Sequence, residues 1–75
     1  MEVKWEDGFE IKVTLQEQER AVVLSANREG LRSLANILLT LADKNPGAHI
    51  HLDEYNSLED GSYELIICQK TTAEG

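Results

Sequence analysis

Apolar and polar residues alternate along two short stretches of the chain, residues 9–15 and 49–53. Side chains of a strand point alternately to its two faces, so this period predicts strands with one buried and one exposed face. Residues 2–5 precede the first stretch, and the Asp7-Gly8 pair between them is a strong hairpin signal. The N-terminal part of the chain is therefore predicted to form two antiparallel strands.

Two further stretches, residues 20–25 and 63–69, are apolar without alternation. This pattern is typical of strands that are covered on both faces, so the last strand is predicted to lie centrally in a sheet. The polar residues 16–19 are expected to turn the chain into the first of these two strands.

One longer stretch, residues 28–44, follows the period of an amphipathic helix. Asn27 suits the N-cap because its side-chain oxygen can accept a hydrogen bond from a free amide of the first turn. Pro46 predicts the end of the helix, since the residue before a proline avoids the helical region. The apolar stripe expected to cover a sheet consists of Leu31, Leu34, Ala35, Leu38, Leu41 and Ala42, widened by Ile37 and Leu39.

The element order β-β-β-α-β-β predicts an α+β fold: a five-stranded, mainly antiparallel sheet with the amphipathic helix packed on one face. The other face of the sheet would stay uncovered. A chain of 75 residues makes one small domain. We expect that domain to span residues 1–70, with residues 71–75 as a flexible tail and Trp5 covering the core.

Composition and charge argue against several classes of ligand. The chain carries 7 Lys and Arg against 14 Asp and Glu, and this net charge of -7 disfavours nucleic acid, whose phosphates need clustered cations. The sequence shows neither a signal peptide nor a run of roughly 20 apolar residues, so no membrane association is expected. The single cysteine, Cys68, cannot form an internal disulfide, which favours a cytoplasmic location.

Acidic residues gather in the last third of the chain, where residues 45–69 contain no Lys or Arg. Such a segment suits a cationic protein partner, because complementary charge speeds encounter and fixes orientation. The alternative is a solvated loop that only maintains solubility. Tyr55 and Leu58 lie among the acids as candidate anchors. The predicted partner-binding residues are Asp53, Glu54, Tyr55, Leu58, Glu59, Asp60 and Glu64.

Pairing of the last two predicted strands determines which side chains share a face. If Ile50 and Leu52 point inward, antiparallel pairing places Leu52 opposite Leu65 and Ile50 opposite Ile67. The outer face then carries three opposed pairs: Asp53 with Glu64, His51 with Ile66, and His49 with Cys68.

The outer face offers two alternatives to simple protein binding. His49, His51 and Asp53 are ligand types for a transition metal, so a small metal-binding protein or metal-dependent enzyme is one alternative. A homodimer packed through the uncovered sheet face, of unknown role, is the other. Neither is preferred, because a polar strand surface needs no ligand to explain it, and no metal or cofactor is predicted.

Catalysis is also weighed on the outer face. Cys68 activated by His49, or Asp53 acting with Glu64, would need a cleft and oxyanion donors that a sheet face does not supply. A lone cysteine among apolar residues is more often a small core residue. The sequence therefore predicts a protein without enzymatic activity.

Several short segments resemble a known family. The sequences HIHLDEY at residues 49–55, LEDGS at 58–62 and LII at 65–67 resemble the C-terminal signature of the immunity protein 32 family. The helix start is similar too, with NREGL at 27–31 and SLA at 33–35. His49, His51 and Glu54 match that signature.

Members of this family are predicted to neutralise toxins of bacterial polymorphic toxin systems. The resemblance therefore implies a cytoplasmic, non-catalytic protein that binds a toxin. The acidic segment agrees with this implication, because many toxins of this kind are basic nucleases. We predict an immunity-type protein that neutralises a basic toxin through the acidic residues 53–60 and the neighbouring sheet face.

Overall fold

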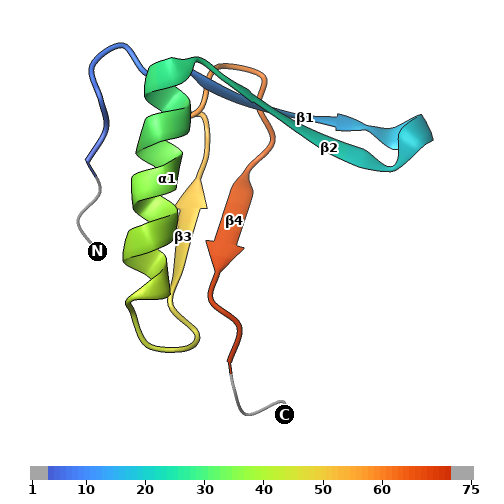
Figure 1. Cartoon of the computed structure of the whole chain (residues 1–75). Helices are drawn as coiled ribbons and strands as arrows, with labels where there is room; N and C mark the ends of the chain where they lie inside the picture. Colours follow the sequence, from blue (N-terminus) through green and yellow to red (C-terminus); the bar gives the residue numbers. More distant parts are fainter. Residues whose placement is uncertain (1–3, 72–75) are drawn as a thin grey trace.

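The computed structural model describes residues 4–71 of the chain. Their elements follow the order β1 (Ile11–Gln16), η1 (Glu17–Glu19), β2 (Ala21–Ala26), α1 (Arg28–Ala42), β3 (His49–Leu52) and β4 (Leu65–Cys68). The predicted α+β class is confirmed. The predicted five-stranded sheet is wrong, because residues 4–71 form two separate two-stranded sheets, β1-β2 and β3-β4 (Figure 1). Of the predicted tail, residues 72–75 lie outside the described part.

β1 and β2 form an antiparallel hairpin that extends away from the rest of the molecule (Figure 1). We call this hairpin, residues 11–26, the arm. The turn predicted from the polar residues 16–19 is confirmed, since η1 occupies it. Arg20 closes the turn in the left-handed region, at φ 54°.

Within the described residues, the predicted N-terminal hairpin is wrong, because no strand precedes β1. Asp7 and Gly8 do form a turn, but Lys4 and Trp5 are not in a strand, and residues 1–3 lie outside the described part.

Residues 5–9 are held by a hydrogen bond to α1 and by stacking of their own aromatic rings, not by pairing with another strand. The Glu6 amide donates a hydrogen bond of 2.9 Å to Ser33 Oγ on α1, and the Trp5 ring stacks on Phe9 with centroids 4.5 Å apart. The segment is therefore drawn along the helix. Trp5 packs partly buried against the core, as predicted.

β3 and β4 pair in the predicted register, with Leu52 opposite Leu65 and Ile50 opposite Ile67. The predicted central position of the last strand is wrong, because β4 pairs with β3 in a sheet of its own. The outer edge of β1, where a further strand would pair, is occupied instead by residues 59–63 of the loop before β4.

α1 begins at Arg28, and the predicted N-cap is confirmed: Asn27 Oδ1 accepts a hydrogen bond of 2.8 Å from the Gly30 amide. The helix ends at Ala42, two residues before the predicted end at Lys44. Gln69, just after β4, donates its side-chain amide to the carbonyls of Leu41 and Lys44, at 2.9 and 3.0 Å. A side chain from the end of the sheet therefore satisfies the helix C-terminus.

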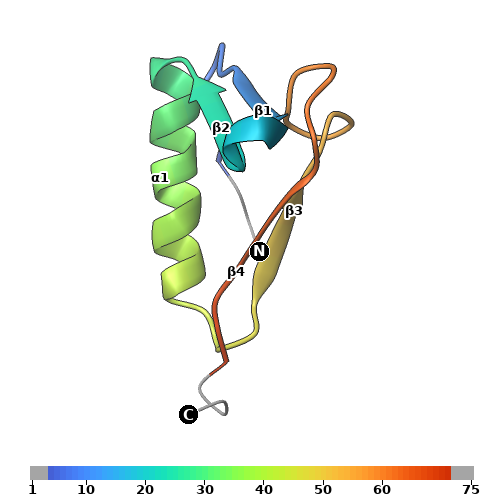
Figure 2. The same cartoon turned by 90° about the vertical axis from the view of Figure 1, so that its right-hand side faces the viewer.

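The core lies between α1, the inner face of β3-β4 and the base of the arm (Figure 2). Its buried side chains are Ile11, Val13, Leu34, Ile37, Leu52 and Leu58. The predicted helix stripe is only partly buried, since Leu31, Leu38 and Leu39 remain 54%, 50% and 67% exposed. A two-stranded sheet is too narrow to cover the whole stripe. Among the described residues, no helix has the length and apolar character needed to cross a membrane.

Candidate functional site

The acidic segment forms a folded loop between β3 and β4, which we call the acidic loop, residues 53–64 (Figure 1). Its first half winds around one carbonyl: the Asp53 oxygen accepts from the amides of Asn56, Ser57 and Leu58, at 3.2, 3.0 and 2.8 Å. The Asp53 side chain accepts from the Tyr55 amide at 2.9 Å. Asp and Asn commonly start turns in this way, because their side chains bond the following backbone.

The second half of the acidic loop is fixed to β1. The Glu59 amide donates to the Ile11 carbonyl at 2.8 Å, and the Tyr63 amide donates to the Val13 carbonyl at 2.9 Å. In return, the Val13 amide donates to Ser62 Oγ at 3.1 Å. Leu58 is 5% exposed and belongs to the core. The loop is thus attached to the molecule at both its ends and its middle.

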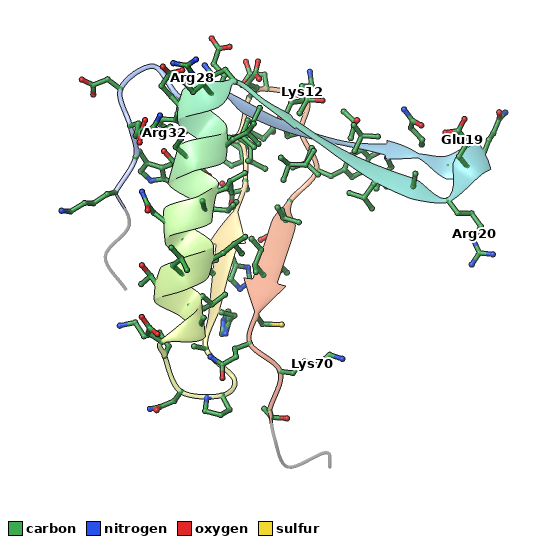
Figure 3. The ribbon with its side chains drawn as sticks, in the orientation of Figure 1. Lys12, Glu19, Arg20, Arg28, Arg32 and Lys70 are labelled. Carbon is green, nitrogen blue, oxygen red and sulfur yellow. The ribbon has the colours of Figure 1, made fainter. Side chains whose placement is uncertain are left out.

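A hydrogen bond between Gly61 and Glu54 joins the two halves of the acidic loop. The Gly61 amide donates to Glu54 Oε2 at 2.6 Å, which is a charge-assisted hydrogen bond. Gly61 has φ 85°, a conformation that glycine adopts without strain. Lys12, labelled in Figure 3, passes its side chain beside Gly61. One cation of β1 therefore lies near the loop, although the loop itself has none.

The predicted partner-binding residues differ in how they contribute to the loop. Tyr55 is 91% exposed, and the side chains of Glu59 and Asp60 also face solvent. Leu58 is buried, so in the structure it anchors the loop rather than offering an exposed apolar surface. Glu54 is exposed but also braces the loop through Gly61. Tyr55, Glu59 and Asp60 are therefore the exposed members whose side chains form none of the hydrogen bonds that fix the loop.

Sequence reasoning missed a second exposed aromatic residue in the same loop. Tyr63 is 51% exposed and directly precedes Glu64. The sequence pattern predicts Tyr63 in the last strand, but β4 begins only at Leu65. The available signal in the sequence is its position next to an acidic residue, which Tyr63 shares with Tyr55.

The outer face of β3-β4 shows how the histidines are used. The rings of His49 and His51 lie edge to face with centroids 5.1 Å apart. His51 Nδ1 lies 2.9 Å from Glu64 Oε2, and Asp53 is turned away into its own loop. Within residues 4–71, no group of three or more His, Cys, Asp and Glu side chains is arranged to hold a metal ion.

Two other expectations for this face need correction. The ladder ends at Leu52 and Leu65, so Asp53 and Glu64 lie beyond it and do not form the expected opposed pair. Cys68 does lie opposite His49, as predicted, but its side chain is exposed rather than part of the core. The cause is its outward position on β4, on the face of the sheet that no other element of residues 4–71 covers.

Several carboxylates of the acidic loop form no ion pair with a described residue. In the described part of the chain, the ion pairs join Arg32 to Glu6, at 3.5 Å, and His51 to Glu64 if the histidine is protonated. Glu54, Glu59 and Asp60 are in neither pair. Unpaired carboxylates on a fixed loop produce a negative field that a cationic partner would encounter.

The fold and this loop define the class: a small α+β domain that presents an acidic, aromatic-bearing loop held by backbone hydrogen bonds. The sequence model of the immunity protein 32 family matches residues 21–70, two thirds of the 75-residue chain. This chain therefore belongs to the immunity protein 32 family. Comparison with curated proteins and with solved structures found no match. The matched segment begins with β2 and includes the whole acidic loop.

Proposed function

We propose that this protein is a non-catalytic, immunity-type protein that binds and neutralises a basic bacterial toxin through the acidic loop. Membership of the immunity protein 32 family supports the toxin as the class of partner. The observation that carries the choice of surface is the exposure of Tyr55, Glu59 and Asp60 on a loop whose backbone is fixed.

Charge supports a basic partner. The chain has a net charge of -7, and the acidic loop contains no Lys or Arg. Complementary charge across an interface raises the association rate and selects the partner's orientation. A toxin that acts on nucleic acid must itself be cationic where it binds phosphate, so the acidic loop would compete for that surface.

Rigidity supports the loop as a binding surface. Ordering a mobile loop on binding reduces affinity, whereas a loop already held by backbone hydrogen bonds avoids that cost. Tyr55 adds a large, almost fully exposed ring to the charged surface. Tyrosine is enriched among the few residues that dominate binding energy at interfaces, so Tyr55 is the proposed anchor and the carboxylates surround it.

Co-expression with a toxin tests the proposal. The product of a toxin-like reading frame beside the gene would be expressed in a bacterial host with the wild-type chain or with the Glu59→Lys/Asp60→Lys variant. We expect the wild type to restore growth and the variant to bind the toxin at least about tenfold more weakly, since two attractive contacts become repulsive.

A charge-matched control uses the far end of the arm. The Glu17→Lys/Glu19→Lys variant changes the net charge by the same amount but lies far from the acidic loop (Figure 1), and it should protect as well as the wild type. Equal toxin binding by the loop variant and the wild type would rule out the acidic loop as the toxin-binding surface. Failure of the wild type to protect would remove that toxin as the partner.

A further inference from the structure

β2 is an edge strand whose outer side is free among the described residues. β1 pairs with β2 on one side and with the acidic loop on the other. β2 has β1 on one side, and in the described part of the chain no strand pairs with its other side. An unpaired edge of this kind is a template for a strand of another chain.

The direction of the main-chain groups on β2 follows from those on β1. The carbonyls of Ile11 and Val13 point away from β2, because they accept from the acidic loop. In an antiparallel ladder, when the main-chain amide and carbonyl of one residue point away from the partner strand, those of the residue opposite also point away. Val13 lies opposite Leu24 and, by the same alternation, Leu15 opposite Val22. Val22 and Leu24 therefore direct their amides and carbonyls to the free edge.

The arm is apolar on the face that continues from the core. Ile11 and Val13 are buried at its base, and beyond them on the same face lie Leu15, Val22 and Leu24, which are 42%, 62% and 37% exposed. Far from the base, the body of the molecule no longer covers this face (Figure 1). A hydrophobic edge strand left open is a site of chain association.

The exposed flank of α1 lies beside this edge. Residues of a helix follow one another at about 100°, so Leu31 and Leu38 project to the side opposite Ser33, which contacts the N-terminal segment. Figure 2 shows β2 on the side of the arm nearer α1 and β1 on the side nearer the acidic loop. A hairpin added beyond β2 would therefore approach the apolar flank of the helix.

We propose that this edge pairs with β2 of a second copy of the same chain, in antiparallel orientation about a two-fold axis through Val23. Val22 of each copy then lies opposite Leu24 of the other, and both residues have their main-chain groups at the edge. The result is a four-stranded sheet whose apolar face runs through both arms. The exposed end of each arm reaches the helix flank of the other copy.

Charge selects a second copy and this register. The strand AVVLSA contains no charged residue, so two chains of net charge -7 can meet here without opposing like charges. Pairing about Val23 brings the arm tip, with Glu19, to the arm base, with Arg28 of the second copy; both residues are exposed (Figure 3). A shift that centres the axis on Leu24 would instead set Arg20 opposite Arg28.

The proposed dimer is independent of toxin binding. The acidic loop occupies the outer edge of β1, and the second copy would occupy the outer edge of β2. A dimer therefore leaves both acidic loops open. Since the tests below use the purified protein alone, their failure would leave the proposed function untouched, and failure of the toxin test would leave the dimer untouched.

Sedimentation velocity over a range of concentrations tests the association. We expect the wild type to reach twice its mass of 8.4 kDa. Val22→Lys places one charge in each copy, so the two-fold axis brings two like charges into the interface. The variant should raise the dissociation constant of the dimer at least about tenfold. Gln16→Lys adds the same charge on β1 and should leave the constant unchanged. A wild type that stays monomeric, or equal weakening by both variants, would overturn the proposal.

A cross-link tests the register. Residue 23 faces itself across the axis as a non-hydrogen-bonded pair, where the Cα atoms are about 4.5 Å apart, within the range a disulfide spans. In a Cys68→Ser background, Val23→Cys should form a covalent dimer on oxidation. Ala21→Cys should not, because its copies would lie about 13 Å apart. No cross-link at residue 23, or equal cross-linking at residue 21, would overturn the pairing.

Discussion

The acidic loop and the outer half of the arm are both exposed, but the protein holds them in opposite ways. The loop has no regular secondary structure, yet its backbone is bonded to β1 and to itself, and Leu58 fixes it in the core. The arm is regular, yet beyond its base it leaves Leu15 and Val22 exposed. Regular secondary structure is therefore not the measure of how firmly a segment of this molecule is held.

The difference also separates two kinds of surface. The acidic loop presents charge and aromatic rings on a fixed backbone, which suits a partner that is selected by charge. The arm presents neutral apolar side chains and free main-chain groups, which suits pairing with another strand.

The largest expected difference comes from removing one leucine side chain in each region. Leu58→Ala should lower the free energy of unfolding by about 3 kcal/mol, because it empties a buried position. Leu15→Ala removes the same atoms from a position 42% exposed and should cost about 1 kcal/mol or less. Urea denaturation of the two variants measures both values. Equal losses would show that the arm is packed as firmly as the loop.

The second prediction concerns the joint where α1 crosses the base of the arm. A Cβ atom at Gly30 would lie 2.5 Å from the Glu10 carbonyl oxygen and 2.9 Å from Ile11 Cγ1. We expect Gly30→Ala to cost about 2 kcal/mol, although alanine favours a helix by about 1 kcal/mol over glycine. Asn36→Ala, at an exposed position of the same helix, is the control and should be neutral or stabilising. Thermal denaturation that ranks Gly30→Ala above the wild type would contradict this close packing.

The sequence was sufficient where the deciding interactions are local. The cap at Asn27, the alternation at residues 49–53 and the Asp7-Gly8 turn each depend on a few neighbouring residues, and the structure contains all three features. The register of β3 with β4 was also predictable, because only one pairing buries Ile50 and Leu52 together with their partners.

The sheet arrangement was not predictable, because distant side chains decide it. Ser33 on α1 takes the Glu6 amide that the predicted first hairpin would have used, and the acidic loop takes the edge of β1. The apolar residues of β2 predict a strand covered on both faces, whereas Val22 is exposed. Composition indicates that a strand is apolar, but it does not indicate whether the chain supplies a cover for it.

The candidate site was predictable only in its local features, because contacts with distant parts of the chain decide which of its side chains are buried. The acidic character of residues 53–64 is a property of the sequence and remains in the structure. That Leu58 is buried and Tyr63 exposed depends on where the loop meets β1, which no local pattern reports.

A third prediction compares the same substitution in the loop and in the arm. Ser62→Ala removes the acceptor of the buried Val13 amide and should cost about 1 kcal/mol in unfolding free energy. Ser25→Ala, on the exposed part of β2, should change stability by less than about 0.5 kcal/mol. Hydrogen exchange offers a direct readout: the Val13 amide should exchange faster in the Ser62 variant only. An unchanged rate there would mean that the hydroxyl does not protect this amide.

The smallest expected effect distinguishes two acidic residues within the loop. Glu54→Gln weakens the charge-assisted bond to the Gly61 amide and should cost about 0.5 kcal/mol. Glu59→Gln only lowers the negative charge of a chain at -7, so it should leave stability unchanged or slightly raised. Urea denaturation at low and moderate salt measures the change in unfolding free energy of each variant. A change of the same sign in the two variants would contradict the bracing role of Glu54. Because Glu54 is both a brace and an acid, a loss of binding in a Glu54 variant would mix loop distortion with lost charge, whereas Glu59 and Asp60 report on charge alone.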